Sequence, residues 1–287
     1  MHEATINGEL SVPVQRIGPI GSHILQTLDR RAIPVFSIQK HRGVLASLST
    51  PQLHSALHTL EAGGYLQAIE RGKYVVRPRA GTGKVWQENP YVIADAIAPD
   101  PHYISFWSAL AYWNLTTQLP STVYIVIRGG RPRTLPFQHH QYRLVLRSEP
   151  YFTDFEPVEC YASSGMELRI PFATPEKAIL DSLEDETLAG GLPEIVGALR
   201  QGLQNGKLEI DRLVQLGAKY PTAATASRLG FLLQRLGYSE ALSPLHRRRT
   251  TGQRALLRPG AAVRQGSADR DWNLVVNVSD DIFEDNG

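Results

Sequence analysis

The segment Ser37–Pro78 constrains the fold more than any other part of the sequence, because it holds a helix start, a helix stop and a tight turn in quick succession. Thr50 can supply an N-cap oxygen, and Pro51 fits the first helical position, where its missing N–H costs nothing. Gly63 and Gly64 then end the helix, since glycine accepts the left-handed conformation. The apolar residues between these signals predict one buried helix face: Leu53, Leu57 and Leu60.

Further elements flank this helix. Gly21 and Ser22 precede a helical run that Ile33–Pro34 ends, and Ser37 can cap a second helix. Beyond the third helix, a charged turn at Glu70–Gly72 separates two β-rich stretches, which fits a hairpin. Three helices followed by a hairpin is the order of a winged helix-turn-helix, a fold that places its last helix in the major groove of DNA.

The face of the third helix that points away from its apolar stripe carries donors and acceptors that can read base edges. Basic side chains nearby can contact phosphates, and two of them, Arg71 and Lys73, lie at the tip of the hairpin. The alternative is a solvated polar face on a small helical domain. We predict a DNA-binding surface that contains Lys40, Arg42, Thr50, Gln52, His54, Ser55, His58, Arg71 and Lys73.

Charge supports a local surface and excludes a whole-molecule attraction to DNA. The chain has 287 residues and a formal net charge of only +2, whereas residues 1–80 carry nine basic side chains against five acidic ones. The lone Cys160 excludes an internal disulfide and fits a reducing cytosol. No apolar run is long enough to span a membrane, and no signal peptide precedes the first helix, so we expect a cytoplasmic protein without membrane contact.

Two other basic stretches can form a second surface for nucleic acid or for an acidic partner. One runs from His246 to Arg264 without an acidic residue, and the alternative for it is a solvated loop. The other, Arg128–Arg133, has a Gly-Arg-Pro core like a minor-groove hook, but a β-rich run leads into it and favours a basic turn. The residues of this second surface are Arg131, Arg133, Arg247, Arg248, Arg249 and Arg254.

The remaining chain mixes helical and β-rich segments, so we expect an α+β protein in which a winged helix-turn-helix precedes a larger mixed α/β domain. The expected order is an N-terminal extension at 1–20, the winged helix-turn-helix at 21–79, a linker at 80–90 and the second domain at 91–287. Gly81–Lys84 in the linker is not a phosphate loop, because Val85 stands where that motif needs Ser or Thr.

A catalytic function fits this sequence poorly. A metal-dependent nuclease needs an acid-x-lysine pair on a strand, whereas Glu176 and Lys177 are adjacent and in a helical segment. His54 and His58 have zinc-ligand spacing, but position 55 is Ser rather than the Glu of a zinc protease. We therefore predict no enzyme activity, no catalytic residues, no metal and no cofactor, with a DNA-processing enzyme as the remaining alternative.

Four groups of motif residues follow one another along the chain: Tyr103-Ile104-Ser105 with Ser108-Ala109-Leu110, the run from Ala173 to Asp181 (ATPEKAILD), Ser227 to Leu233 (SRLGFLL) with Gly237, and Trp272 to Asn277 (WNLVVN). Together these motifs resemble the AbiEi family of antitoxins. The order matches too, with a winged helix before a larger domain, and the likeness covers about Gly21 to Val278. Met1–Pro19 lies outside it.

This resemblance implies a transcriptional autorepressor that binds double-stranded DNA at its own promoter, typically at inverted repeats, as a dimer or cooperatively. It also implies an antitoxin that counteracts a nucleotidyltransferase-type toxin from the same operon without a stable complex. The alternative is a stand-alone regulator whose second domain senses a ligand or oligomerises. A nucleotidyltransferase gene next door would favour the first interpretation.

The motif residues themselves fit structural roles. Thr174 and Pro175 predict another helix start, where Glu176 and Lys177 form a cap pair. We expect Arg228 to form a buried or half-buried pair with Asp181 or Glu184.

Overall fold

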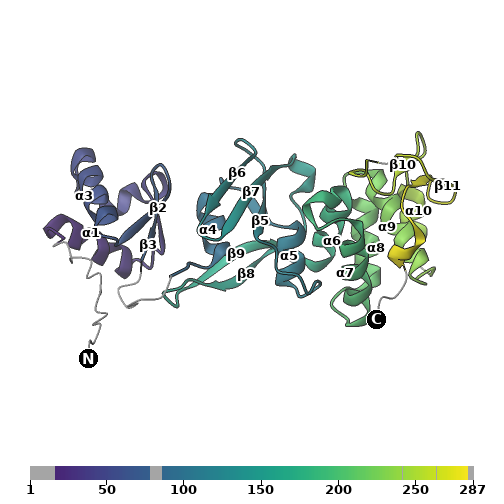
Figure 1. The fold of residues 1–287 in the computed structure, drawn as a ribbon, viewed down its shortest axis with the longest axis horizontal. Coiled ribbons are helices and arrows are strands. Elements are labelled where there is room, and N and C mark those ends of the chain that lie inside the picture. Colours follow the sequence, from purple (N-terminus) through teal and green to yellow (C-terminus); the bar gives the residue numbers. More distant parts are fainter. Residues whose placement is uncertain (1–16, 78–85, 241, 263, 284–287) are drawn as a thin grey trace, which may run out of the picture. The chain divides into compact units, whose positions relative to one another are not determined.

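The computed structural model describes residues 17–77, 86–240, 242–262 and 264–283 (Figure 1). It is a mixed α+β chain that divides into two compact units. The first comprises Met1–Glu88 with the turn Ala162–Met166, and the second comprises Asn89–Tyr161 with Glu167–Gly287. The expected extension at 1–20 and the linker at 80–90 fall largely outside the described residues, as does the rejected phosphate loop.

The described part of the first unit contains three α-helices, one short 3-10 helix and one small sheet. Its strands pair in the order β1-β3-β2, and both pairings are antiparallel. Sequence patterns had predicted the β2–β3 hairpin but not β1, whose Val35 lies opposite Val75. In chain order the elements are α1 (Pro19–Arg30), β1 (Val35–Ser37), α2 (Ile38–His41), the 3-10 turn η1 (Arg42–Leu45), α3 (Thr50–Ala62), β2 (Leu66–Glu70) and β3 (Lys73–Val76).

The core of this unit confirms the apolar stripe of α3. Leu53, Leu57 and Leu60 are buried against Ile24 and Leu28 of α1, in a cluster that also holds apolar residues of β1, η1 and β2. Burying such side chains contributes about 1.5–3 kcal/mol each, so this stripe fixes which face of α3 points outward.

Three local predictions in this unit were wrong. The N-cap of α3 is Ser49 rather than Thr50, because the Ser49 hydroxyl accepts from the Gln52 amide and the Gln52 side chain bonds back to Ser49. The first helix begins at Pro19, so Gly21 and Ser22, which were expected to precede it, lie within it. The second helix, capped by Ser37 as expected, breaks at His41 and continues as η1.

The second unit is built on a six-stranded mixed sheet with the order β6-β7-β5-β4-β9-β8. The strands β5 and β7 are parallel, as are β4 and β9, while the remaining neighbours are antiparallel. Helices α4 (Pro90–Ile97) and α5 (Phe106–Tyr112) pack on the sheet. The strands are β4 (His102–Ile104), β5 (Thr122–Ile127), β6 (Arg133–Phe137), β7 (His140–Leu146), β8 (Phe155–Tyr161) and β9 (Glu167–Ala173).

Helices follow the sheet and fill the other end of this unit (Figure 1). They are α6 (Pro175–Glu184), α7 (Leu192–Gln204), α8 (Ile210–Lys219), α9 (Ala223–Arg235) and α10 (Ser243–Arg248). A small sheet of order β10-β12-β11 covers α9 and consists of β10 (Ala255–Leu256), β11 (Ser267–Asp269) and β12 (Leu274–Val276). Short 3-10 turns are η2 (Glu149–Tyr151), η3 (Glu186–Leu188) and η4 (Asp280–Phe283).

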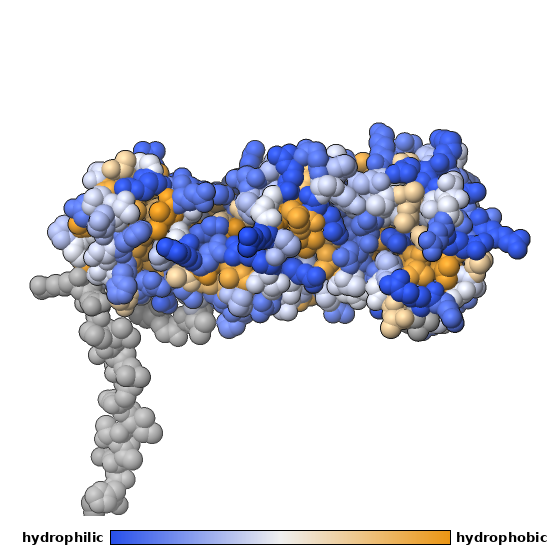
Figure 2. All heavy atoms as spheres, turned by 90° about the horizontal axis from the view of Figure 1, so that it is seen from above, coloured by the Kyte–Doolittle hydropathy of each residue, from blue (hydrophilic) through white to orange (hydrophobic). Residues whose placement is uncertain are grey.

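The surface seen in Figure 2 is mostly hydrophilic, with apolar residues in separate patches. Within the ranges that the structure describes, no helix has the length and apolar character needed to cross a membrane.

Candidate functional site

The outer face of α3 is the first candidate site, because five hydrogen-bonding side chains lie exposed on it. They are Gln52, His54, Ser55, His58 and Thr59. Since every third or fourth residue shares a face of a helix, 52, 55 and 59 form one row and 54 and 58 form the adjacent row. The apolar residues of α3 point the opposite way into the core, so all five side chains are presented to solvent together.

Gln52 also caps the start of α3, a role that was not predicted from the sequence. Its Oε1 accepts from the backbone N–H of Ser49 at 2.9 Å, and its own N–H donates to the Ser49 hydroxyl at 3.4 Å. This reciprocal pair of hydrogen bonds is a capping box, which satisfies two backbone N–H groups at the helix start. The carboxamide NH₂ of Gln52 is still available to a ligand.

The basic residues predicted to contact DNA divide into two kinds. Arg71 is exposed at the β2–β3 turn, and Lys40 is exposed near the end of α2. Lys73 forms an ion pair with Glu70 at 3.1 Å across the same turn. Arg42 also has a structural role, because its guanidinium donates to the carbonyls of Leu45 and Leu48, at 2.8 and 2.6 Å, and so holds the α2–α3 connection.

The six arginines of the predicted second surface are not equivalent. Arg131 and Arg133 are exposed where the β5–β6 connection meets β6. This connection is not a simple hairpin turn, because β7 lies between β5 and β6 in the sheet. No acidic residue occurs between Asp100 and Glu149, a stretch that contains five arginines, so this part of the sheet is strongly basic.

The arginines after α9 serve mainly as structural donors. Arg248 donates to the carbonyls of Pro221 and Tyr220, at 2.9 and 3.3 Å, and Arg249 lies 3.2 Å from Nδ1 of His246. Arg247 is exposed and bonds to Ser243 of its own helix, while Arg254 is exposed. Two of these four arginines are therefore half-buried and bind groups of the chain itself, and Arg247 and Arg254 are the exposed members of the predicted surface.

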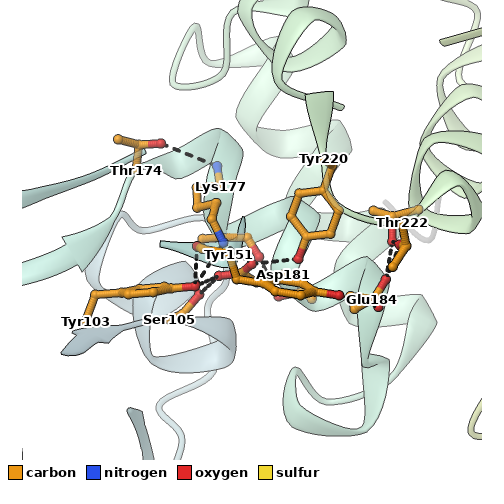
Figure 3. A network of polar contacts seen from close by, with 12 residues as sticks. Tyr103, Ser105, Tyr151, Thr174, Lys177, Asp181, Glu184, Tyr220 and Thr222 are labelled. Carbon is orange, nitrogen blue, oxygen red and sulfur yellow. Dashed lines mark hydrogen bonds and ion pairs between the residues drawn. The ribbon is translucent and has the colours of Figure 1, made fainter. Parts of the chain in front are cut away.

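The second candidate site is a buried polar network centred on Asp181 of α6 (Figure 3). One carboxylate oxygen of Asp181 accepts from Ser105 at 2.6 Å and from Tyr103 at 3.2 Å. The other accepts from Tyr220 at 2.7 Å and forms an ion pair with Lys177, one helical turn earlier. One carboxylate therefore joins elements that are far apart in sequence: β4, the start of α5, α6 and the end of α8.

Burial governs the ionisation of this network. It lowers the pKa of Lys177, although Asp181 acts in the opposite direction, and it raises the pKa values of Tyr103 and Tyr220 well above their usual range, with Asp181 as the second cause. Both tyrosines therefore remain protonated donors. The side chains of Lys177 and Asp181 are 2% exposed, so both charges are shielded from solvent and each is the other's ion-pair partner.

A second carboxylate of α6, that of Glu184, binds side chains from other elements of the second unit. Glu184 accepts from Thr222 at 2.6 Å and from Tyr151 at 3.1 Å, and Arg228 lies 4.0 Å from it. Tyr151, with its pKa raised to about 12 by burial and by Glu184, also remains a donor. Arg228 thus pairs with Glu184, one of its two expected partners, and also donates to the carbonyls of Leu256 and Leu183 at 2.9 and 3.1 Å.

Glu176 and Lys177 were not the cap pair that their position predicted. Glu176 is buried and accepts from the backbone N–H of Glu209, while Arg212 lies 3.5 Å away. Lys177 points to Asp181 instead. Tyr103 and Ser105 were noticed only as part of a motif, and nothing in the sequence linked Tyr220 to Asp181. In the part of the chain that the structure describes, no group of three or more His, Cys, Asp or Glu side chains is arranged to hold a metal ion.

Comparisons with known proteins give a fold likeness and no family. No protein-family model matches the chain, and no match is found among curated proteins. The chain is similar to the crystal structure of the RV2827C protein from Mycobacterium tuberculosis, with a TM-score of 0.60 and 17% identity over 92% of this chain and 94% of that one. At such identity the likeness concerns the fold alone.

Proposed function

We propose that the chain is a DNA-binding transcriptional autorepressor whose first unit is a winged helix-turn-helix. The observation that carries this proposal is the exposed polar face of α3, which the apolar core of the unit holds outward. A helix that presents side-chain donors and acceptors on its solvent face can enter the major groove and read base edges.

The turn between β2 and β3 supports the same assignment. Arg71 is exposed there, and Gly72 takes a positive φ of 78°, which allows the tight turn. The Gly72 carbonyl accepts from the backbone N–H of Ile38 at 2.8 Å, so this turn is tied to the start of α2. A basic side chain on a held turn is suited to a phosphate contact, as on the wing of a winged helix.

We further propose that the protein is the antitoxin of a nucleotidyltransferase-type toxin encoded in the same operon. This second role rests on the resemblance of the sequence motifs to the AbiEi family. Several of those motif residues, Tyr103, Ser105, Lys177 and Asp181, lie in one buried network that organises the second unit. In this chain these motif residues hold elements of the second unit together, and no catalytic step is assigned to them.

Gln52→Glu is the sharpest test of the proposed DNA-reading face. Glutamate also completes a capping box at this position and favours the helix N-terminus, so the thermal midpoint of unfolding should stay unchanged or rise slightly. The new carboxylate repels DNA and removes the carboxamide NH₂ donor. We expect affinity for the DNA upstream of the gene to fall by about tenfold or more, since one base contact contributes about 1–3 kcal/mol.

Two companion variants separate recognition from folding. Gln26→Glu places the same charge on an exposed position of α1 and should leave DNA affinity nearly unchanged. Gln52→Ala loses the capping box and should destabilise the first unit by about 1 kcal/mol. Equal affinities for the parent chain and Gln52→Glu, measured by fluorescence anisotropy, would show that α3 does not face DNA at this position.

A further inference from the structure

A polar pocket of about 270 Å³ lies in the second unit, where the last turns of α7 and α9 come close to η4. It is separate from the buried Asp181 network and from the α3 face. Its lining is rich in donors and consists of Arg200, Gln204, Arg235, Leu236, Tyr238 and Phe283.

Both arginines of this pocket are held by groups of the chain's own η4 segment. Arg200 donates from Nη2 to the carbonyl of Phe283 at 2.7 Å, and Arg235 forms an ion pair with Asp280. The guanidinium of Arg235 also lies 4.9 Å from the centre of the Phe283 ring. The η4 segment therefore already supplies a carboxylate and a carbonyl oxygen to the two guanidinium groups.

The contacts that η4 makes with these two arginines are weak enough for another anion to replace them. The side chains of Arg235 and Asp280 are 42% and 77% exposed, and ion pairs in such positions contribute about 0–1 kcal/mol. Phe283 adds one edge-on contact to Phe231, with ring centres 6.0 Å apart. The sequence continues this acidic character, because Asp281 follows Asp280 and Glu284 and Asp285 follow Phe283.

We propose that this pocket binds the phosphate group of a small ligand of the nucleotide class, whose oxygens replace the Asp280 carboxylate and the Phe283 carbonyl at the two guanidinium groups. Two guanidinium forks can bind several oxygens of one phosphate, which suits a phosphate better than a single carboxylate. Tyr238 and Gln204 also line the pocket and carry side-chain donors. Because 270 Å³ exceeds the size of a phosphate ion, space remains for part of a sugar or base.

Isothermal titration of the full chain with pyrophosphate, AMP and adenosine tests this assignment in the absence of DNA. We expect saturable binding of pyrophosphate and AMP at one site, and no binding of adenosine. Asp280→Asn, which weakens the internal competitor, should raise affinity about two- to fivefold, as expected for loss of an exposed ion pair. Because no DNA is present, the result does not depend on the proposed role of α3.

Two variants locate the site. Arg235→Gln should lower affinity at least tenfold, whereas Arg169→Gln, at an exposed arginine of β9 outside the pocket lining, should leave it unchanged. Gln204→Glu is a nearly isosteric change at an exposed helix end, so the chain should fold normally while the added charge abolishes binding. Absence of binding to the parent chain at millimolar ligand, or equal binding by Gln204→Glu and the parent, would overturn the assignment.

Discussion

Asp181→Asn is expected to lower the free energy of unfolding of the second unit by about 3–5 kcal/mol, the loss typical when one partner of a buried ion pair is removed. The side chain stays the same size, so no cavity forms and the effect is electrostatic. Asparagine has one side-chain oxygen, whereas the carboxylate receives Ser105, Tyr103, Tyr220 and Lys177 on two. The NH₂ group of asparagine is itself a donor, and it would face a hydroxyl donor or the ammonium group of Lys177.

Removal of Lys177 should cost less than removal of the Asp181 charge. In Lys177→Met the carboxylate keeps three hydroxyl donors, at 2.6, 2.7 and 3.2 Å. In Asp181→Asn the ammonium group loses its ion-pair partner and keeps the Tyr103 hydroxyl, at 3.0 Å, and two aromatic rings. The order of the two losses therefore distinguishes a carboxylate-centred network from an isolated ion pair.

Urea unfolding followed by circular dichroism measures both changes. Asp271→Asn, at an exposed aspartate of the same unit, is the matched control and should alter the unfolding free energy by less than about 0.5 kcal/mol. A loss below about 1 kcal/mol for Asp181→Asn would show that the network contributes little to folding.

Gly230→Ala is the second change with a large expected effect, about 3 kcal/mol of destabilisation or more, from overpacking. Gly230 lies inside α9, and a Cβ there would stand 2.1–2.5 Å from three atoms of the Trp272 ring. That ring is fully buried and donates from Nε1 to Gln234 at 2.6 Å. It also stacks on His246 at 3.9 Å, so it has little freedom to move away.

Gly197→Ala supplies a control with the opposite sign. Gly197 lies in the helix α7, and nothing stands within 4 Å of the Cβ that alanine would add. Alanine is the better helix former, so this variant should gain about 0.5–1 kcal/mol. Thermal unfolding of both variants checks the pair, and equal midpoints for Gly230→Ala and the parent would mean that α9 and Trp272 are not packed as described.

Local signals predicted several elements of the fold. The helix that carries Leu53, Leu57 and Leu60 was predicted from its apolar spacing, and the helix start at Thr174 and Pro175 was predicted from its cap and proline. Short strands were missed, since β1 and β4 have only three residues each and too little alternation to be recognised. The strand β6 was missed because proline and two exposed polar residues obscure its pattern.

The exposed face of α3 was predictable and the buried network was not. The α3 prediction needed only one helix period and a buried stripe, both of which are local. Tyr103, Asp181 and Tyr220 are separated by 78 and 39 residues along the chain, so only the tertiary fold brings them together. The different tasks of Arg42 and Arg248 were also hidden, because an arginine that binds backbone carbonyls has the same sequence signature as one that binds phosphate.

The most direct test of the central proposal is the affinity of the purified full chain for the DNA upstream of its gene, compared with a scrambled duplex at two salt concentrations. Phosphate contacts alone weaken steeply with salt and ignore sequence, whereas base reading preserves a preference. We expect the preference for the upstream DNA to persist at the higher salt concentration. Equal binding to both duplexes that disappears with salt would contradict a sequence-reading repressor.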